Sequence, residues 1–286
     1  MKISKKKKVE REPQYYNTLT NIKALNYKVY YMGYVEKAIT FLAVFAIGAG
    51  CGYLFFGGLC KNEFNEATKA TYVLNIMIPG VIGTIAGYIF LPIRVEQIIA
   101  KRQNMIKKQF LDMLEGLSTS LNAGKNVTDA FLAVQGDLLS QYEQEAFINN
   151  EMRIIISGIR NNQELEELLS DFGKRSGVKD IAMFASIFRI SYRKGGDIKD
   201  VIKNTNDIMR DKIMIQEEIE TTMTSGKNEL NTMMAMPVIM VALFKSMGDE
   251  MGRNFATTAG VIAIIVSLII FAAALFVGRK IMEIKV

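Results

Sequence analysis

Apolar residues along the chain follow two different patterns. In the first and last thirds, uncharged apolar runs approach or reach the length of about 20 residues that a helix needs to cross a bilayer. Between them, apolar residues recur every three or four positions, the spacing of amphipathic helices. The predicted transmembrane helices are residues 39–59, 72–93, 230–248 and 257–277.

These four helices form two predicted hairpins, at residues 38–93 and 230–278. The uncharged core of the helix at 230–248 covers only 15 residues. We expect it to span by extending past Lys245, whose ammonium group can reach the interface while its stem lies in lipid. A tilted or re-entrant segment is the alternative.

Small residues in the first hairpin favour close packing of its two helices. Gly48 and Gly52 lie four residues apart on the first helix, and Gly83 and Gly87 have the same spacing on the second. Such pairs let helices approach closely in lipid.

Residues 94–229 predict helices throughout, because no segment shows the sustained alternation of a strand. The last of these helices is long and leads towards the predicted span at 230–248, with Lys212 as a polar intruder on its apolar face. The predicted fold class is all-α: a polytopic membrane protein with four transmembrane helices and one cytoplasmic bundle of about six helices. The expected core positions are Phe110, Leu114, Leu117, Leu121, Ala130, Phe131, Val134, Met152, Ile155, Ile156, Ile159, Leu165, Leu168, Leu169, Phe172, Ile181, Phe184, Ala185, Phe188, Ile198, Val201, Thr205, Ile208, Ile215, Ile219 and Met223.

The breaks between these helices resemble one another. "AGKNVTDAF" (123–131) aligns without a gap with "KGGDIKDVI" (194–202). In each, a glycine closes one helix, Asn or Asp caps the next, and an acid follows in its first turn. The predicted corner residues are Gly124 and Asn126 in the first motif, and Gly195, Gly196 and Asp197 in the second.

A third break, "SGIRNNQELEELL" (157–169), has a similar composition. We expect Gly158 to end a helix there and Asn162 to cap the next. Because the pattern occurs at three helix starts, we interpret it as a structural turn rather than as a ligand-binding loop.

Basic residues indicate the orientation in the membrane. Nine Lys or Arg residues lie within residues 1–37, and three more follow the last predicted span in the tail 279–286. By the positive-inside rule, both termini and the block 94–229 are cytoplasmic. Residues 1–37 are expected to include an amphipathic, interfacial helix before the first span.

The candidate chemistry is sparse. Histidine is absent, which removes the commonest general base and most zinc sites. "NAGKNV" lacks the Ser or Thr of a phosphate loop, and "RKGGD" lacks the spacing of a dinucleotide fingerprint. A cation site built from Glu151, Asp171 or Asp197 stays open, although no calcium-loop spacing supports it. Basic and acidic residues are nearly balanced in the central block, which disfavours nucleic-acid binding.

The order and spacing of these motifs resemble the type II secretion F-protein family. They are most similar to the single-domain inner-membrane platform proteins of tight-adherence (Flp, type IVc) pilus systems. The residues that carry the resemblance are "QFLDMLEGLSTSLNAGKNVTDAF" (109–131), "GIRNNQELEELLSDFGKRSGVKDI" (158–181), "SIFRISYRKGGDIKDVIKNTNDIMRDKI" (186–213), "EIETTMTSGKNELNTMMAMPVIM" (218–240) and "VGRKIMEIKV" (277–286).

The resemblance implies a bacterial inner-membrane platform that couples a cytoplasmic secretion ATPase to pilin extraction and fibre assembly. It implies no catalytic residue, no cofactor and no metal. The implied partners are the ATPase, pilin subunits, the lipid bilayer, and a second platform subunit or a second copy. We expect Arg175, Arg193, Lys194 and Asp197 to be exposed and to contact the ATPase.

Other functions are weighed against this one: a small-solute membrane transporter subunit or other membrane scaffold, and a membrane enzyme. A small-solute transporter subunit would usually need an ionisable residue at depth, and the apolar cores contain no Asp, Glu or Arg. A membrane enzyme would need a nucleophile, a base or a metal cluster.

Overall fold

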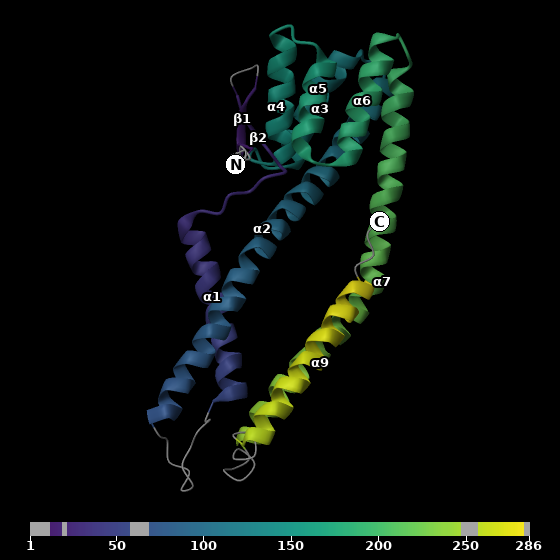
Figure 1. Ribbon diagram of the computed structural model, residues 1–286. Helices are drawn as coiled ribbons and strands as arrows, with labels where there is room; N and C mark the ends of the chain where they lie inside the picture. The colour runs from purple at the N-terminus through teal and green to yellow at the C-terminus, as the bar shows by residue number, and fades with distance from the viewer. Residues whose placement is uncertain (1–11, 19–21, 58–68, 247–256, 283–286) are drawn as a thin grey trace, which may run out of the picture. The chain divides into compact units, whose positions relative to one another are not determined.

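The computed structural model describes residues 12–18, 22–57, 69–246 and 257–282 (Figure 1). Over these residues the protein is helical apart from one short β-hairpin, so the prediction of an all-α fold is confirmed at that level.

The chain forms two compact units, which are described separately. Residues up to 31 and residues 95–214 form what we call the bundle unit. Residues 32–94 and 215–286 form what we call the apolar unit.

The bundle unit combines a β-hairpin with packed helices. Strands β1 (Tyr15–Asn17) and β2 (Lys23–Leu25) pair antiparallel, with Tyr16 opposite Ala24. The helices are the second part of α2 (Lys69–Asn122), α3 (Val127–Gln141), α4 (Phe147–Arg160), α5 (Leu165–Ser176), α6 (Lys179–Arg193) and the first part of α7 (Ile198–Ser246).

The core of the bundle unit is centred on α2. Phe110 is fully buried, and its ring packs edge-on against Phe172 of α5 and Phe184 of α6, with centroids 5.9 and 5.4 Å apart. Most core positions predicted on α2 to α6 are buried. Those that are buried are Phe110, Leu114, Leu117, Ala130, Phe131, Val134, Met152, Ile155, Ile156, Leu165, Leu168, Leu169, Phe172, Ile181, Phe184, Ala185 and Phe188.

The apolar face predicted for α7 is wrong in part. Ile208 is 53% exposed and Ile215 is 47% exposed, whereas Ile202 and Met209 join the core. Both sets have helical spacing, because faces one residue apart differ by about 100° on a helix. The neighbouring helix decides between them, and the sequence of α7 alone does not.

The N-terminal segment differs from the predicted amphipathic helix. Strands β1 and β2 form a β-hairpin there, and the carbonyl oxygen of the Asn26 side chain accepts a hydrogen bond from the Lys28 amide at 3.1 Å. Ala24 and Tyr27 are each 1% exposed, so their apolar surface is covered by the bundle. The apolar spacing taken for a lipid-facing helix is instead that of a segment packed on protein.

The apolar unit contains α1 (Tyr34–Phe56), the first part of α2, the last part of α7 and α9 (Thr258–Met282). Three helices are long and apolar enough to cross a membrane: α1, α2 and α9 over residues 259–278. They contain most of the predicted spans 39–59, 72–93 and 257–277. The predicted span 230–248 lies within α7 up to Ser246, where Asn231, Thr232 and Lys245 reduce the apolar character.

Lys245 is tied to the end of α1 within the apolar unit. Its ammonium Nζ donates to the carbonyl of Gly57 at 3.0 Å. Gly57 caps the C-terminus of α1, where a cation complements the helix dipole. The lysine that interrupts the predicted third span therefore has an acceptor inside the unit.

Glycines set the packing of α1 on α2. A Cβ atom added at Gly48 would lie 3.1 Å from the Cα of Gly83, and one added at Gly83 would lie 2.8 Å from the carbonyl oxygen of Phe45. The small-residue spacing in the sequence therefore marks a close contact between these two helices.

We predict that Gly83→Ala destabilises the protein, because backbone of α1 occupies the space of the added methyl group. Overpacking of this kind costs about 1–3 kcal/mol. The matched control is Gly80→Ala on the same helix, where a Cβ would meet nothing within 4 Å. Thermal unfolding of the full chain in detergent measures both variants. Equal midpoints for the two would contradict the packing described here.

Candidate functional site

The corners before α3 and α7 share one backbone geometry. Gly124 and Gly195 adopt the left-handed conformation, with φ of 85° and 68°. Beyond each glycine, the amide of the following residue bonds back across the last helical turn: Lys125 N–H donates to the Ser120 carbonyl at 3.2 Å, and Gly196 N–H to the Ser191 carbonyl at 2.8 Å. This is the Schellman arrangement.

Both corners then begin a helix with a side-chain cap. Oδ1 of Asn126 accepts from the Asp129 amide at 2.8 Å. Oδ1 of Asp197 accepts from the Lys199 amide at 2.9 Å and from the Asp200 amide at 3.3 Å. These bonds satisfy amides that the first helical turn leaves without partners. The repeated motif thus has the structural role that its sequence predicts.

The third corner differs from its prediction. Gly158 lies inside α4, and the left-handed residue is Asn162, with φ of 56°. A Cβ at Gly158 would lie 2.5 Å from the Leu168 side chain, so this glycine allows α5 to pack closely. Glu164, not Asn162, is the N-cap of α5, and its side chain makes no capping bond.

Three of the four expected contact residues lie together at the α6–α7 corner. Arg193 ends α6, Lys194 is its C-cap, and Asp197 precedes α7. Arg193 bonds the start of α5: its Nε lies 3.0 Å from Oε1 of Glu166, and its Nη2 lies 2.8 Å from Oε2 of Glu164. The charge of Arg193 is therefore shared with glutamates, although its side chain is half exposed, and Lys194 and Asp197 are also exposed.

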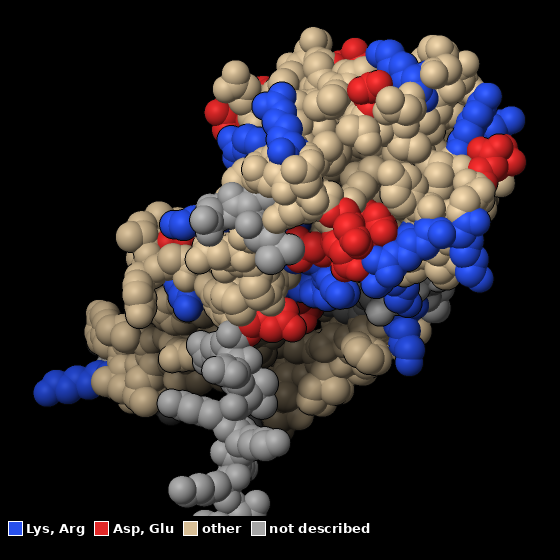
Figure 2. All heavy atoms as spheres, turned by 90° about the horizontal axis from the view of Figure 1, so that it is seen from above, with Lys and Arg blue, Asp and Glu red and all other residues tan. Residues whose placement is uncertain are grey.

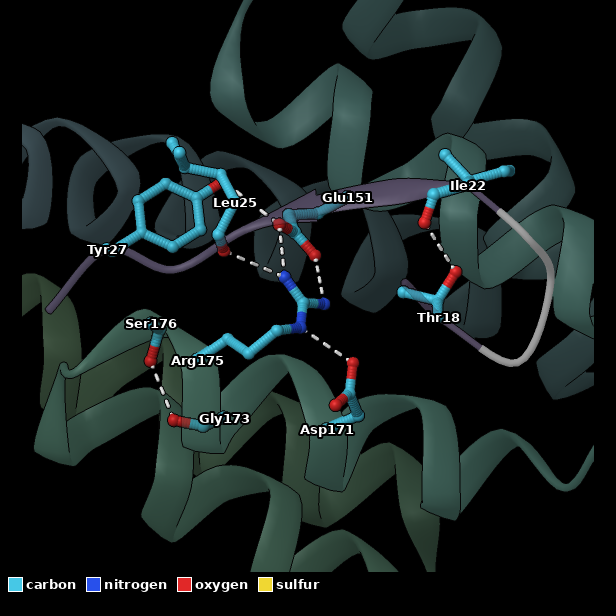
Figure 3. Close-up of polar contacts among 9 residues, drawn as sticks. All are labelled: Thr18, Ile22, Leu25, Tyr27, Glu151, Asp171, Gly173, Arg175 and Ser176. Carbon is cyan, nitrogen blue, oxygen red and sulfur yellow. Dashed lines mark hydrogen bonds and ion pairs between the residues drawn. The ribbon is translucent and has the colours of Figure 1, made fainter. Parts of the chain in front are cut away.

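The expectation that Arg175 is exposed is wrong, because only 4% of it is accessible. Its guanidinium forms a bidentate ion pair with Glu151, from Nη1 to Oε1 at 2.9 Å and from Nη2 to Oε2 at 2.7 Å (Figure 3). Nε donates to Asp171 at 2.7 Å, and Nη1 also donates to the carbonyl of Leu25 at 3.1 Å.

This buried pair holds the segment that follows the β-hairpin. The Tyr27 hydroxyl donates to Oε1 of Glu151 at 3.0 Å, and the Tyr27 amide donates to the Arg175 carbonyl at 3.0 Å. The Tyr27 ring packs edge-on against Phe147, with centroids 5.4 Å apart. Strand β2, α4 and α5 therefore meet at one cluster, which we call the Arg175 cluster: Tyr27, Glu151, Asp171 and Arg175.

The electrostatics of the cluster follow from burial and from the Glu151 carboxylate. Burial, then the charge of Glu151 and its hydrogen bond, raise the pKa of Tyr27 well above 10.0. Burial alone would lower the pKa of Arg175, but the hydrogen bonds and charge of Glu151 outweigh it and raise that pKa above its ordinary value. The neutral phenol and the charged guanidinium are thus both favoured by the fold.

The three acids considered as possible cation ligands have other partners in the structure. Glu151 and Asp171 both bind Arg175, and Asp197 caps α7 elsewhere. No group of three or more potential metal ligands occurs within the part of the chain that the structure describes. A cavity of about 320 Å³ adjoins the cluster, lined by Glu12, Tyr16, Asn17, Thr18, Asn26, Lys28, Asp171, Lys174 and Arg175.

A second ion cluster joins three helices. Asp180 at the start of α6 is 9% exposed. Its carboxylate lies 2.6 Å from Nζ of Lys212 on α7 and 3.8 Å from Nζ of Lys107 on α2. Lys212, the polar residue that interrupts the predicted apolar face of this helix, therefore links α7 to α6.

The surface of the bundle unit carries mixed charge. Figure 2 shows basic side chains beside acidic ones, with uncharged surface between them. Two such exposed pairs are Arg189 with Glu167 and Arg210 with Glu115, each at 2.9 Å. Exposed pairs of this kind contribute little to stability, about 0–1 kcal/mol.

We predict that Arg175→Met destabilises the fold by about 3–5 kcal/mol, because it leaves the buried Glu151 carboxylate without its counter-charge. Arg189→Met breaks only an exposed pair and should cost under about 1 kcal/mol. Chemical unfolding of the full chain in detergent compares them. Adding Glu151→Leu to Arg175→Met should recover part of the loss, and a loss no larger than that of Arg189→Met would contradict the role of the cluster.

We also predict a loss of stability at high pH that depends on Tyr27. Because its pKa is higher in the folded than in the unfolded state, its contribution is fully present below about pH 10 and declines as pH rises through the folded pKa. The slope attributable to one such group is at most about 1.4 kcal/mol per pH unit. Tyr27→Phe should flatten the dependence of the unfolding free energy on pH, whereas Tyr15→Phe, on an exposed ring, should not.

Comparison with known proteins supplies one match. No curated protein and no solved structure matches the chain. The family model of type II secretion system (T2SS), protein F matches residues 107–244. The match begins in the second part of α2 and ends near the C-terminus of α7. It includes the corners before α3 and α7 and the Arg175–Glu151 pair. Over these residues, the chain is similar to the type II secretion system F-protein family.

Proposed function

We propose that the protein is an inner-membrane platform of a pilus assembly or type II secretion-like machine. It couples a cytoplasmic ATPase to pilin extraction and fibre assembly, and it has no catalytic role of its own. The observation that carries this proposal is the family match over residues 107–244, which covers most of the helical part of the bundle unit and most of α7. The order of motifs along the chain further favours a platform of the tight-adherence (Flp, type IVc) class.

The proposed topology has four transmembrane helices and both termini in the cytoplasm. Three helices have the required length and apolar character. The fourth, residues 230–248, is proposed to span with Lys245 at the interface. The clustering of Lys and Arg in residues 1–37 and 279–286 supports this orientation, and it places the block 94–229 in the cytoplasm.

Force transmission would use the two long helices. α2 continues for 54 residues and α7 for 49, and each passes from the bundle unit into the apolar unit without a break. The Lys107–Asp180–Lys212 cluster ties both helices to α6. A motion imposed on the bundle would therefore be carried along continuous helices rather than through flexible loops.

Only one F-type domain is matched on this chain. The assembly is therefore proposed to include a second platform subunit or a second copy, together with pilins and lipid. A transporter has less support, since the apolar cores of the predicted spans carry no Asp, Glu or Arg.

The proposed ATPase contact is the α6–α7 corner, with Arg193, Lys194 and Asp197. Arg175 is not part of this proposed contact, because it is buried in the Arg175 cluster. Lys194 is the most informative of the three, because it is exposed and its side chain is not needed for the turn.

We predict that Lys194→Glu weakens binding of the cytoplasmic secretion ATPase about tenfold, which corresponds to roughly 1.4 kcal/mol for reversing one charge at a contact. The matched control is Lys125→Glu, which makes the same change at the twin corner before α3. A second variant, Asp197→Asn, removes the negative charge of Asp197 but keeps a side-chain oxygen that can cap α7. Co-purification and titration of the full chain in nanodiscs measure the affinity.

Two results would count against the proposal. Failure of the unaltered protein to bind the ATPase would overturn the platform function. Equal affinities for Lys194→Glu and Lys125→Glu would show that the contact lies away from the α6–α7 corner.

A further inference from the structure

The outward face of α6 carries apolar residues that stay exposed in the part of the bundle unit that the structure describes. Met183, Ile187 and Ile190 are 48%, 41% and 57% exposed. They lie at i, i+4 and i+7, so they form one stripe along the helix. The same helix buries Phe184 and Phe188 on its opposite side. α6 is therefore apolar on two faces, and only one of them is core.

α7 carries a further exposed apolar residue close to the start of α6. The ion pair of Lys212 with Asp180 places that part of α7 beside the start of α6. Ile208 lies one turn before Lys212 on the same side of α7 and is 53% exposed. We call Met183, Ile187, Ile190 and Ile208 the α6 stripe. Exposed apolar residues gathered on one side of a protein are a recurrent mark of a protein contact.

On α6 and its C-cap, the exposed charged residues at the two ends of the stripe are both basic. Lys179 and Lys194 are exposed at its two ends, about 22 Å apart along the helix axis at 1.5 Å per residue. The only acid on α6, Asp180, is buried against Lys212 and Lys107. The arginines of α6 are paired with glutamates of α5.

We propose that the α6 stripe is the docking surface for an amphipathic helix of the partner ATPase, one whose apolar side is flanked by acidic residues. This rests on the proposed function, since Lys194 belongs to the α6–α7 corner already assigned to the ATPase. The apolar residues supply the buried contact. The two end lysines select acidic flanks and set the orientation.

Charge argues against a second copy as the occupant. In an antiparallel pairing of two α6 helices, Lys179 of each copy would face Lys194 of the other. In a parallel pairing, each lysine would face its own equivalent. Both arrangements bring like charges together at the ends of the stripe, and like charges in an interface are repulsive.

Charge also argues against an anionic membrane surface. Each basic residue near such a surface adds only about 1 kcal/mol of attraction. The stripe offers two such lysines, and Glu164 and Glu167 lie beside the arginines at one edge of α6. Interfacial helices carry many more basic residues on their polar face than α6 does.

Thiol labelling of the full chain in nanodiscs tests the occupant directly. In a background of Cys51→Ser and Cys60→Ser, Ile187→Cys places a single thiol on the stripe. Leu139→Cys on α3, where the native residue is 47% exposed, is the matched control. With the ATPase at ten times its Kd, labelling at position 187 should slow about tenfold, because roughly one protein in eleven stays free. Labelling at position 139 should not change.

Ile190→Ser tests the apolar contact without a cysteine. It should weaken ATPase binding about fivefold or more, because it truncates an apolar side chain of the proposed contact. Leu139→Ser should leave the affinity unchanged. The double variant Lys179→Glu with Lys194→Glu should also weaken ATPase binding, and it should make that binding less dependent on salt concentration.

The outcomes separate the two proposals. If the ATPase binds the unaltered protein but leaves position 187 open to labelling, the stripe is not its contact and this inference fails while the function stands. Protection in anionic nanodiscs without ATPase would assign the stripe to lipid, and protection that rises with protein concentration alone would assign it to a second copy. If the ATPase does not bind at all, the proposed function and this inference, which rests on it, both fail.

Discussion

The buried ion pair of Arg175 with Glu151 is the constraint on which the bundle unit depends. Taking two charges out of water costs several kcal/mol for each ion, so the pair is tolerated only where its remaining donors and acceptors are satisfied. The carbonyl of Leu25, the hydroxyl of Tyr27 and the carboxylate of Asp171 meet that demand. Each comes from a different part of the chain than Glu151, so the pair also fixes how strand β2, α4 and α5 meet.

This constraint links residues on both sides of α1 and α2 in the sequence. Strands β1 and β2 precede α1, whereas Glu151 and Arg175 follow α2, yet all belong to the bundle unit. The chain is therefore held by the bundle unit both before α1 begins and after α2 leaves the apolar unit.

The sequence predicts the helices and their corners well, because both depend on local chemistry. A left-handed glycine followed by Asn or Asp as a cap can be recognised from a few residues, as at Gly195 and Asp197. The Arg175 cluster depends on contacts between residues far apart in the sequence, 124 positions in the case of Tyr27 and Glu151. No local pattern distinguishes a buried arginine at the end of a helix from an exposed one. The same limit applies to Asn162 and Gly158, where the packing of α5 on α4 decides which residue takes the left-handed turn.

The α6 stripe shows a related limit of apolar periodicity. On α6 the core residues and the stripe residues both recur every three or four positions, so spacing alone would assign either face to the core. On α7 the same ambiguity places Ile208 in the predicted core, although the structure exposes it. Charge separates the two faces, since the core face of α6 ends at the buried Asp180, whereas the outer face ends at exposed lysines. An apolar face that ends in exposed lysines is therefore better explained by the proposed partner with acidic flanks than by the core of its own bundle.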